Sequence, residues 1–264
     1  MKKKNTNFFT SKEFNNDLIK YGFFTRNGGF SSKPFNKLNC NLSSEDNLMH
    51  VNQNINQAKK ELGLEKTKIK FINQVHGNHI EFITEKNIEK KIIADGIITQ
   101  KNNISLAILT ADCAPVFLIN LKNRIITALH IGWKGCLNDI IEKAILKIKK
   151  IDHFTNNTIS IVGPCLNKDN FEVDEVFKSE FLQKNINYKN FFKQNKNSKK
   201  IFFDMRKLID SQLRNLAISN IFHVDKDTYR DKSLFFSHRR STHNLSNITG
   251  RMINIIGFSQ ENIG

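Results

Sequence analysis

The fold is decided by the stretch Leu109–Gly135, which reads LTADCAPVFLINLKNRIITALHIGWKG. It begins at the end of one apolar run, Ile104–Leu109, and it contains a second run, Ile125–Leu129. Both runs have the length and the branched apolar residues of buried β-strands. Cys113 closely follows the first run and His130 directly follows the second. We therefore expect two adjacent strand ends that place a thiolate beside an imidazole.

A third residue of this kind lies upstream of the stretch. The apolar run Ile69–Ile72 is followed by the segment QVHG at 74–77, so His76 also stands after a predicted strand and before a glycine. Together, His76, Cys113 and His130 supply two imidazoles and one thiolate. These three residues form the candidate catalytic site of the chain.

The donor set favours an open metal site. Structural zinc sites are completed by four protein ligands, often in short Cys-x-x-Cys pairs, whereas catalytic zinc sites take three protein ligands and leave a position for water or substrate. None of the three candidate ligands belongs to such a pair. The donor set of His76, Cys113 and His130 is therefore typical of an open catalytic zinc site rather than a closed structural one.

Other interpretations of these residues stay open. A histidine at a strand end is more often a hydrogen-bonded structural residue than a ligand, and a buried cysteine is usually a small apolar side chain. Without a metal, Cys113 and His130 are suited to a metal-independent cysteine hydrolase. A His2Cys set also holds copper, but the eight histidines include no His-x-His pair for a multicopper cluster, so zinc is favoured over copper. Asp112 either orients an imidazole or is a turn residue before Cys113.

Composition bounds the class of protein. The 264 residues contain no linker rich in Pro, Gly or Ser, and we expect one domain over 1–264. The net charge is +16, but the lysines are scattered without a binding motif, so a non-catalytic nucleic-acid-binding protein is the disfavoured alternative. Neither a signal peptide nor a membrane span is predicted. Four widely spaced cysteines without a Cys-x-x-Cys pair favour a cytoplasmic setting.

Apolar periodicity predicts an alternation of strands and helices. The predicted helices are 51–62, with Gly63 as a stop, 137–148 and 205–216, and further strands are 80–83, 97–98 and 159–162. The Asn- and Lys-rich residues 184–200 are expected to form a solvated loop. The pattern predicts an α/β (α+β) fold, a single mixed-sheet domain with helices packed outside the sheets.

Some arginines are candidate anion-binding residues, because a guanidinium fork matches the geometry of phosphate. For each of them the simpler interpretation is a solvated surface charge. They are Arg26, Arg239, Arg240 and Arg251. Trp133 is expected to pack in the core rather than on a substrate. The remaining cysteines are expected to be structural, although Cys136 is close enough in sequence to the second candidate histidine to be a spare ligand.

Nine short motifs occur along the chain in one order. They are TRNGG at 25–29, LNC at 38–40, QVHG at 74–77, ADG at 94–96, TADCAP at 110–115, HIGWKG at 130–135, GPC at 163–165, FFSHRR at 235–240 and TGR at 249–251. Together they resemble the YfiH/laccase-domain family, formerly described as polyphenol oxidases and now as zinc-dependent purine nucleoside phosphorylases. The resemblance covers nearly the whole chain, and nine motifs in register are far more specific than one.

The resemblance implies a sandwich of sheets between helices, with zinc at His76, Cys113 and His130. The implied reactions are phosphorolysis of adenosine, inosine and methylthioadenosine to free base and ribose or methylthioribose 1-phosphate, and hydrolytic deamination of adenosine. Phosphorolysis needs a bound phosphate, for which Arg26 and Arg251 are the predicted substrate-binding residues. A copper-dependent polyphenol oxidase, the family's older description, stays an alternative.

The chain departs from the family pattern at a few positions. The usual Ala of the His-Ala-Gly-Trp motif is Ile131, and the usual Arg after the Trp is Lys134. The Tyr of Phe-Ser-Tyr-Arg is His238, and Asp227-Thr228 replaces a Cys-Thr pair. None of these positions is a predicted metal ligand. Lys134 and His238 bear on how substrate is bound.

Overall fold

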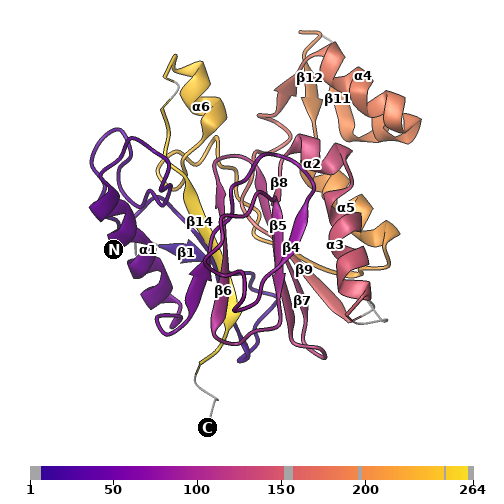
Figure 1. Cartoon of the computed structure of the whole chain (residues 1–264). Helices are drawn as coiled ribbons and strands as arrows, with labels where there is room; N and C mark the ends of the chain where they lie inside the picture. Colours follow the sequence, from indigo (N-terminus) through magenta and orange to yellow (C-terminus); the bar gives the residue numbers. More distant parts are fainter. Residues whose placement is uncertain (1–6, 152–156, 196–197, 247, 261–264) are drawn as a thin grey trace.

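The computed structural model describes residues 7–151, 157–195, 198–246 and 248–260. Two large sheets and one small sheet organise this part of the chain (Figure 1). The five-stranded sheet has the order β1 (Phe8–Phe9), β2 (Ile19–Phe24), β14 (Met252–Phe258), β6 (Ile104–Thr110), β3 (Lys68–Lys70). The six-stranded sheet has the order β13 (Asn220–His223), β9 (Thr158–Val162), β7 (Ala114–Asn120), β8 (Ile125–Ile131), β5 (Gly96–Thr99), β4 (Ile80–Phe82). The three-stranded sheet has the order β10 (Glu172–Val173), β12 (Ile201–Phe203), β11 (Phe192–Gln194).

The two large sheets face each other, and helices cover their outer faces. Because successive strand residues point to opposite faces, Val116 of β7 packs toward α3 (Ile140–Lys149) and α5 (Met205–Asn215), while Phe117 packs toward the other sheet. The rings of Phe117 and Phe23 stack between the sheets with their centroids 4.8 Å apart. The molecule is therefore layered as helices, six-stranded sheet, five-stranded sheet and helix.

The fourth layer is α1 (Leu48–Glu61), which lies on the far side of the five-stranded sheet from α3 and α5 (Figure 1). On β14, Ile255 packs with this helix and Ile256 packs between the sheets. Because both faces of the large sheets are covered, β7, β8 and β14 are buried along their whole length. The predicted mixed α/β fold with outer helices is confirmed.

The structure confirms the first predicted helix and corrects the second. Helix α1 begins after Asn47, whose side chain accepts hydrogen bonds from two backbone N–H groups, and it ends before Gly63, which has a φ of 67°. The helix predicted over 137–148 is confirmed from Ile140 onward, where α3 buries the predicted apolar face, but Leu137 belongs to a separate helix, α2 (Trp133–Leu137). Asp139, at a φ of 60°, interrupts the helical path between them.

The expectation of an irregular loop over 184–200 is also wrong for most of the described residues, although most of them are exposed to solvent as expected. After α4 (Glu175–Lys184), the chain forms a 3₁₀-helix (Ile186–Phe191) and β11. Phe191 is buried, and the ring centroids of Phe192 and Phe203 lie 5.1 Å apart. Aromatic burial outweighs the polar composition of this segment. Residues 196–197 lie outside the described part of the chain.

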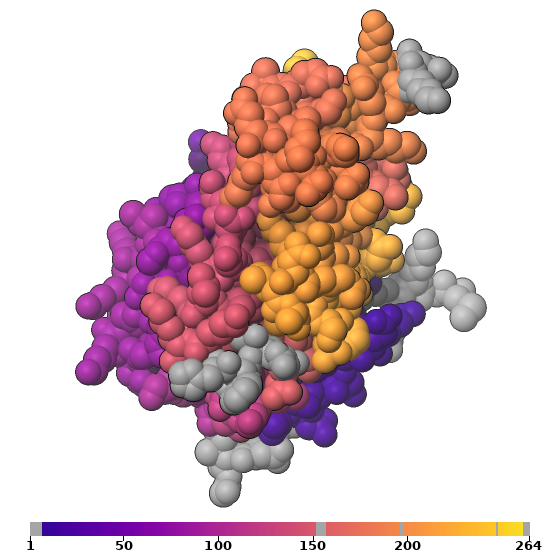
Figure 2. Space-filling view, turned by 90° about the vertical axis from the view of Figure 1, so that its right-hand side faces the viewer, coloured from indigo at the N-terminus to yellow at the C-terminus, as the bar shows by residue number. Residues whose placement is uncertain are grey.

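Residues 171–195 and 198–204 form what we call the upper lobe. It comprises the three-stranded sheet, α4 and the 3₁₀-helix, and it projects from one end of the large sheets (Figures 1 and 2). Helix α6 (His238–His243) lies at the same end of the molecule (Figure 1). None of the helices in the described residues is long and apolar enough to cross a membrane. The predicted single domain over 1–264 stays a prediction.

Candidate metal centre and its cavity

The three predicted metal ligands converge in the structure. His76, Cys113 and His130 each offer one ligand atom, and these atoms lie within 4.8 Å of one another. The two imidazole rings are T-shaped to each other, with centroids 4.8 Å apart. Within the described ranges, this is the one group of three or more His, Cys, Asp or Glu side chains placed to hold a metal ion.

Strand pairing explains why Cys113 and His130 meet, but not in the way expected from the sequence. Strands β6 and β8 belong to different sheets, so their ends are not neighbours within one sheet. Instead β7 and β8 pair antiparallel, with Pro115 opposite His130. Cys113 directly precedes β7 and therefore lies beside the end of β8. The thiol and the imidazole are brought together by this hairpin.

Asp95 anchors both histidines, and sequence reasoning gave it no role. It is fully buried before β5, and its carboxylate accepts a hydrogen bond from His130 Nδ1 at 2.8 Å. The same carboxylate accepts the backbone N–H groups of Val75, His76 and Gly77 at 3.2, 2.9 and 2.6 Å. These bonds hold His76 in a left-handed conformation with a φ of 58°. Because Nδ1 of His130 is engaged, its Nε2 is free to ligate a metal.

Charge coupling favours the thiolate form of Cys113. Burial raises the pKa of a thiol, but the neighbouring His130 charge and hydrogen bonds with both imidazoles outweigh burial and lower the pKa of Cys113 to about 6. In turn, burial lowers the pKa of His130, while Cys113 and Asp95 outweigh it and raise that pKa to about 9. The metal-free site is therefore a stabilised thiolate–imidazolium pair.

This coupling predicts how the metal-free protein reacts with iodoacetamide. The rate of Cys113 alkylation should rise with pH through a midpoint near 6 and level off above it, since the thiolate is the reactive form. The other three cysteines are buried and their thiol pKa values are raised, so they should react far more slowly. Mass spectrometry of the labelled peptides gives the profile. A midpoint near the ordinary thiol value of about 8.5 would contradict it.

Gly132 lies against two of the three candidate ligands, His76 and Cys113. A Cβ atom at this position would lie 3.2 Å from Cys113 Sγ and 3.1 Å from His76 Cδ2. We expect Gly132→Ala to lower zinc affinity about 10-fold by displacing both ligands. Gly135→Ala is the matched control, because its nearest contact would be an ordinary 3.4 Å from the carbonyl oxygen of Gly77. Competition titration with a zinc chelator measures both, and equal affinities would show that Gly132 does not shape the site.

The metal ligands lie in the wall of a cavity of about 1890 Å³, which is lined by the upper lobe and α6 and also by residues 41–43, 70–74 and 88–93. Its aromatic wall includes Phe171, Phe177 and Trp133, and the rings of Trp133 and Phe177 have centroids 4.9 Å apart. Trp133 packs on the core as predicted and also faces this cavity. Its cationic wall includes Arg239 and Arg251. One cavity thus combines candidate ligands, aromatic rings and guanidinium groups.

The predicted anion-binding arginines have different surroundings. Arg26 does not line this cavity: its Nε donates to the Asn36 carbonyl at 2.9 Å and its guanidinium lies 4.3 Å from the centre of the Phe236 ring. Arg240 donates through Nη1 to the carbonyl of Thr228 at 2.8 Å. All four arginines are partly buried, so the interpretation as solvated surface charges is wrong. Of the two predicted substrate-binding arginines, Arg251 is the one at the cavity.

The structure decides two further predictions, on the roles of Asp112 and Cys136. Asp112 does not orient an imidazole, since its carboxylate accepts from Thr228 and Ser237. It is a turn residue before Cys113, with a φ of 91°. Cys136 is buried and lies outside the ligand group.

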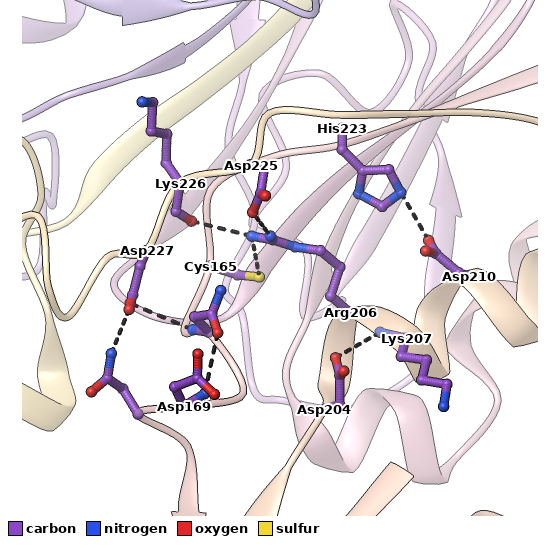
Figure 3. Close-up of polar contacts among 12 residues, drawn as sticks. Cys165, Asp169, Asp204, Arg206, Lys207, Asp210, His223, Asp225, Lys226 and Asp227 are labelled. Carbon is purple, nitrogen blue, oxygen red and sulfur yellow. Dashed lines mark hydrogen bonds and ion pairs between the residues drawn. The ribbon is translucent and has the colours of Figure 1, made fainter. Parts of the chain in front are cut away.

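Cys165 lies in a separate cluster of polar side chains (Figure 3). Its sulfur accepts a hydrogen bond from Nη2 of Arg206 at 3.4 Å, and the same guanidinium forms an ion pair with Asp225. Asp227, in the adjacent loop, accepts a hydrogen bond from the side chain of Asn170. These contacts join α5 to the loops that precede the upper lobe and α6, and they leave Cys165 buried.

Residues 20–259 match the family described as multi-copper polyphenol oxidoreductase laccase. The chain belongs to this family. Within the laccase family, a purine nucleoside phosphorylase of Rickettsia conorii is 37% identical over 179 residues, which cover 66% of this chain and 72% of the relative. A purine nucleoside phosphorylase of Rickettsia prowazekii is 31% identical over 229 residues, which cover 85% and 90%.

Solved structures of related proteins have the same fold as this member of the laccase family. The YfiH protein of Bacillus licheniformis is 25% identical, with a TM-score of 0.81 and coverage of 90% of this chain and 92% of that chain. A Neisseria meningitidis protein superposes with a TM-score of 0.84 at 23% identity, covering 96% and 99%. The predicted membership of the YfiH/laccase-domain family and the YfiH-like fold are therefore confirmed.

The residues present fit a bound metal ion. Two imidazoles and a thiolate are a donor set that zinc accepts, and three protein ligands leave a position for substrate or water. The hydrogen bond from His130 Nδ1 to Asp95 is the outer contact that metal-ligating histidines usually make. The donor set alone does not select zinc over copper, because both metals accept imidazole and thiolate.

Proposed function

We propose that this protein is a zinc-dependent purine nucleoside phosphorylase. The observation that carries the proposal is the convergence of His76, Cys113 and His130 in a cavity whose lining also contains aromatic rings and arginine side chains. The names of its relatives at 37% and 31% identity support the same assignment. The proposed substrates are adenosine, inosine and methylthioadenosine with inorganic phosphate. The predicted cytoplasmic location and the absence of a nucleic-acid partner stay predictions.

Phosphorolysis exchanges one bond at the sugar. A phosphate oxygen forms a bond to the anomeric carbon, the carbon–nitrogen bond to the purine breaks, and the base leaves with the bonding electrons and takes up a proton. Arg251 would bind the phosphate, because a guanidinium pairs with two phosphate oxygens at once. The rings of Trp133 and Phe177 would pack against the purine.

His76, Cys113 and His130 would hold the zinc ion, and Asp95 would fix the ring of His130. When bound, zinc would supply Lewis acidity next to the reacting atoms. The same site would serve hydrolytic deamination of adenosine, in which water oxygen replaces the amino group of the purine and ammonia leaves. This second activity is part of the proposal.

Product analysis with and without phosphate tests the proposed function. Zinc-loaded protein incubated with inosine and phosphate should release hypoxanthine and ribose 1-phosphate in equal amounts, and omission of phosphate should stop base release. With adenosine, inosine should also form without phosphate if the site deaminates. Equal base release without phosphate, or none with any purine nucleoside, would contradict a phosphorylase.

A specific observation favours one second candidate, a metal-independent cysteine hydrolase. Cys113, His130 and Asp95 form a chain of nucleophile, imidazole and carboxylate, in which Asp95 accepts from Nδ1 of His130. The phosphorylase is preferred because His76 also faces the thiol, and a hydrolase has no need of a second imidazole there. Activity that survives zinc chelation but stops on alkylation of Cys113 would favour the hydrolase.

A further inference from the structure

Asp112 connects the loop that carries Cys113 to the start of α6. The residue is buried directly before Cys113, and its carboxylate accepts hydrogen bonds from Thr228 Oγ1 at 2.6 Å and Ser237 Oγ at 3.0 Å. It also accepts the backbone N–H of Arg239 at 2.7 Å. The carboxylate of Asp112 thus fixes the start of α6 to the loop that carries the candidate ligand Cys113. The Arg239 backbone cannot shift without breaking a hydrogen bond to a buried charge.

The side chain of Arg239 enters the cavity from this fixed point. Its Nη1 donates to the carbonyl of Glu172 in the upper lobe at 2.7 Å, and its guanidinium lies 5.4 Å from the centre of the Phe171 ring. Among the described residues, its Nε and Nη2 make no hydrogen bond, and neither is one of the buried atoms without a partner, so both are open to solvent. Arg239 therefore spans from α6 to the upper lobe and keeps donors available in the cavity.

Arg251 lines the same cavity. Its Nη1 donates to its own segment, to the carbonyls of Thr249 and Gly250 at 3.1 Å each, while Nε and Nη2 have no partner among the described residues. Burial lowers the pKa of this guanidinium, while the charges of Cys113 and Asp112 act in the opposite direction. Two partly buried guanidinium groups with unused donors therefore face one volume.

Arg240, on the same helix, has a purely structural role. Both of its terminal nitrogens donate to backbone carbonyls, among them those of Thr228 and Phe235. It lies outside the cavity lining, whereas Arg239 lies within it. The free donors of Arg239, unlike those of Arg240, are available to a ligand. Because a guanidinium group has only N–H donors and a positive charge, that ligand should carry negative charge.

We propose that Arg239 is a phosphate-binding residue that acts together with Arg251, and that Asp112 is the positioning residue that holds the backbone of Arg239 at the edge of this cavity. This inference rests on the proposed phosphorolysis and names the second half of its phosphate site. Two guanidinium forks supply enough donors for the oxygens of a phosphate dianion and offset its charge. The contact between Arg239 and Glu172 also sets the distance between α6 and the upper lobe.

Steady-state kinetics of Arg239→Gln with zinc-loaded protein is the first test. We expect the KM for phosphate to rise about 10- to 100-fold, since a charge-assisted pair is lost, while the KM for inosine stays within about 2-fold. Arg239→Lys should recover part of the loss. Arg230→Gln is the charge-matched control, because Arg230 is exposed and lies outside the cavity lining. If Arg239 only braces the upper lobe, the KM for phosphate will not change selectively, and the inference is wrong.

A double-mutant cycle tests the role of Asp112. Asp112→Asn should raise the KM for phosphate in the same direction as Arg239→Gln. Because Asp112 acts through Arg239, the double variant should match Arg239→Gln within about 2-fold. Ser237→Ala removes one bond to Asp112 and serves as the milder variant if Asp112→Asn does not fold. Additive effects, or an Asp112→Asn variant with unchanged KM values, would contradict a positioning role.

Calorimetric titration with inorganic phosphate separates this inference from the proposed function, because it needs no nucleoside. Phosphate should bind the wild-type chain and Arg230→Gln but bind Arg239→Gln at least about 10-fold more weakly. If the wild-type chain binds phosphate through Arg239 but cleaves no nucleoside, the phosphorylase proposal fails and the anion site stands. If it cleaves nucleosides and Arg239→Gln binds phosphate equally well, the anion site fails and the phosphorylase stands.

Discussion

The Cys113→Ser variant should keep its fold but lose bound zinc and turnover. Serine nearly preserves the volume of cysteine, and Cys113 is only partly buried, so the hairpin of β7 and β8 should persist. A neutral hydroxyl is a poor zinc ligand, whereas the thiolate is favoured here by two imidazoles. Loss of a direct ligand should cost at least the ~100-fold in metal affinity that loss of an outer contact costs.

Metal analysis, circular dichroism and phosphorolysis of inosine measure the three effects in parallel. Cys40→Ala is the matched control, because Cys40 is fully buried in a separate apolar cluster between α1 and the five-stranded sheet. This control should bind zinc normally even if its stability falls slightly. A Cys113→Ser variant with unchanged zinc content and activity would remove Cys113 from the site.

The Asp95→Asn variant should weaken both the metal centre and the fold. The buried carboxylate accepts four hydrogen bonds, one from His130 and three from the backbone at 75–77. An amide keeps one oxygen and turns an N–H₂ group toward donors, so at least one buried N–H loses its partner. We expect zinc affinity to fall ~10- to 100-fold and the free energy of unfolding to fall by ~1–3 kcal/mol.

Chelator competition measures the zinc affinity, and urea denaturation measures the unfolding free energy. Asp17→Asn, at an exposed position, is the control and should change neither quantity. If Asp95→Asn loses stability but binds zinc normally, Asp95 supports the 75–77 loop without orienting His130. Normal values for both would show that the hydrogen bonds contribute nothing measurable.

The ligand set could be predicted from the sequence because its local signals are strong. His76, Cys113 and His130 each come after an apolar run in the sequence, and the motifs around them are specific. The pairing that unites two of them could not be derived, since apolar runs do not reveal which strands share a sheet. Strand β6 was the expected neighbour of β8, whereas β7 and β5 are its actual neighbours.

Residues whose partners are backbone atoms far along the chain were not predictable. The role of Asp95 depends on N–H groups 18 to 20 positions upstream and on a ring 35 positions downstream. Asp112 reaches Thr228, Ser237 and Arg239, which are more than 100 positions away. The upper lobe was missed because its aromatic residues are dispersed among Asn and Lys, and only the folded chain gathers them.

Zinc content of the purified protein, compared with phosphate-dependent release of hypoxanthine from inosine, tests the central claim most directly. The account predicts one zinc ion per chain, loss of phosphorolysis when the metal is removed, and recovery when zinc is restored. Copper at the same stoichiometry with activity restored by copper alone would contradict the zinc assignment. A folded protein that binds no metal, and that stays inactive after zinc is added, would contradict the metal centre itself.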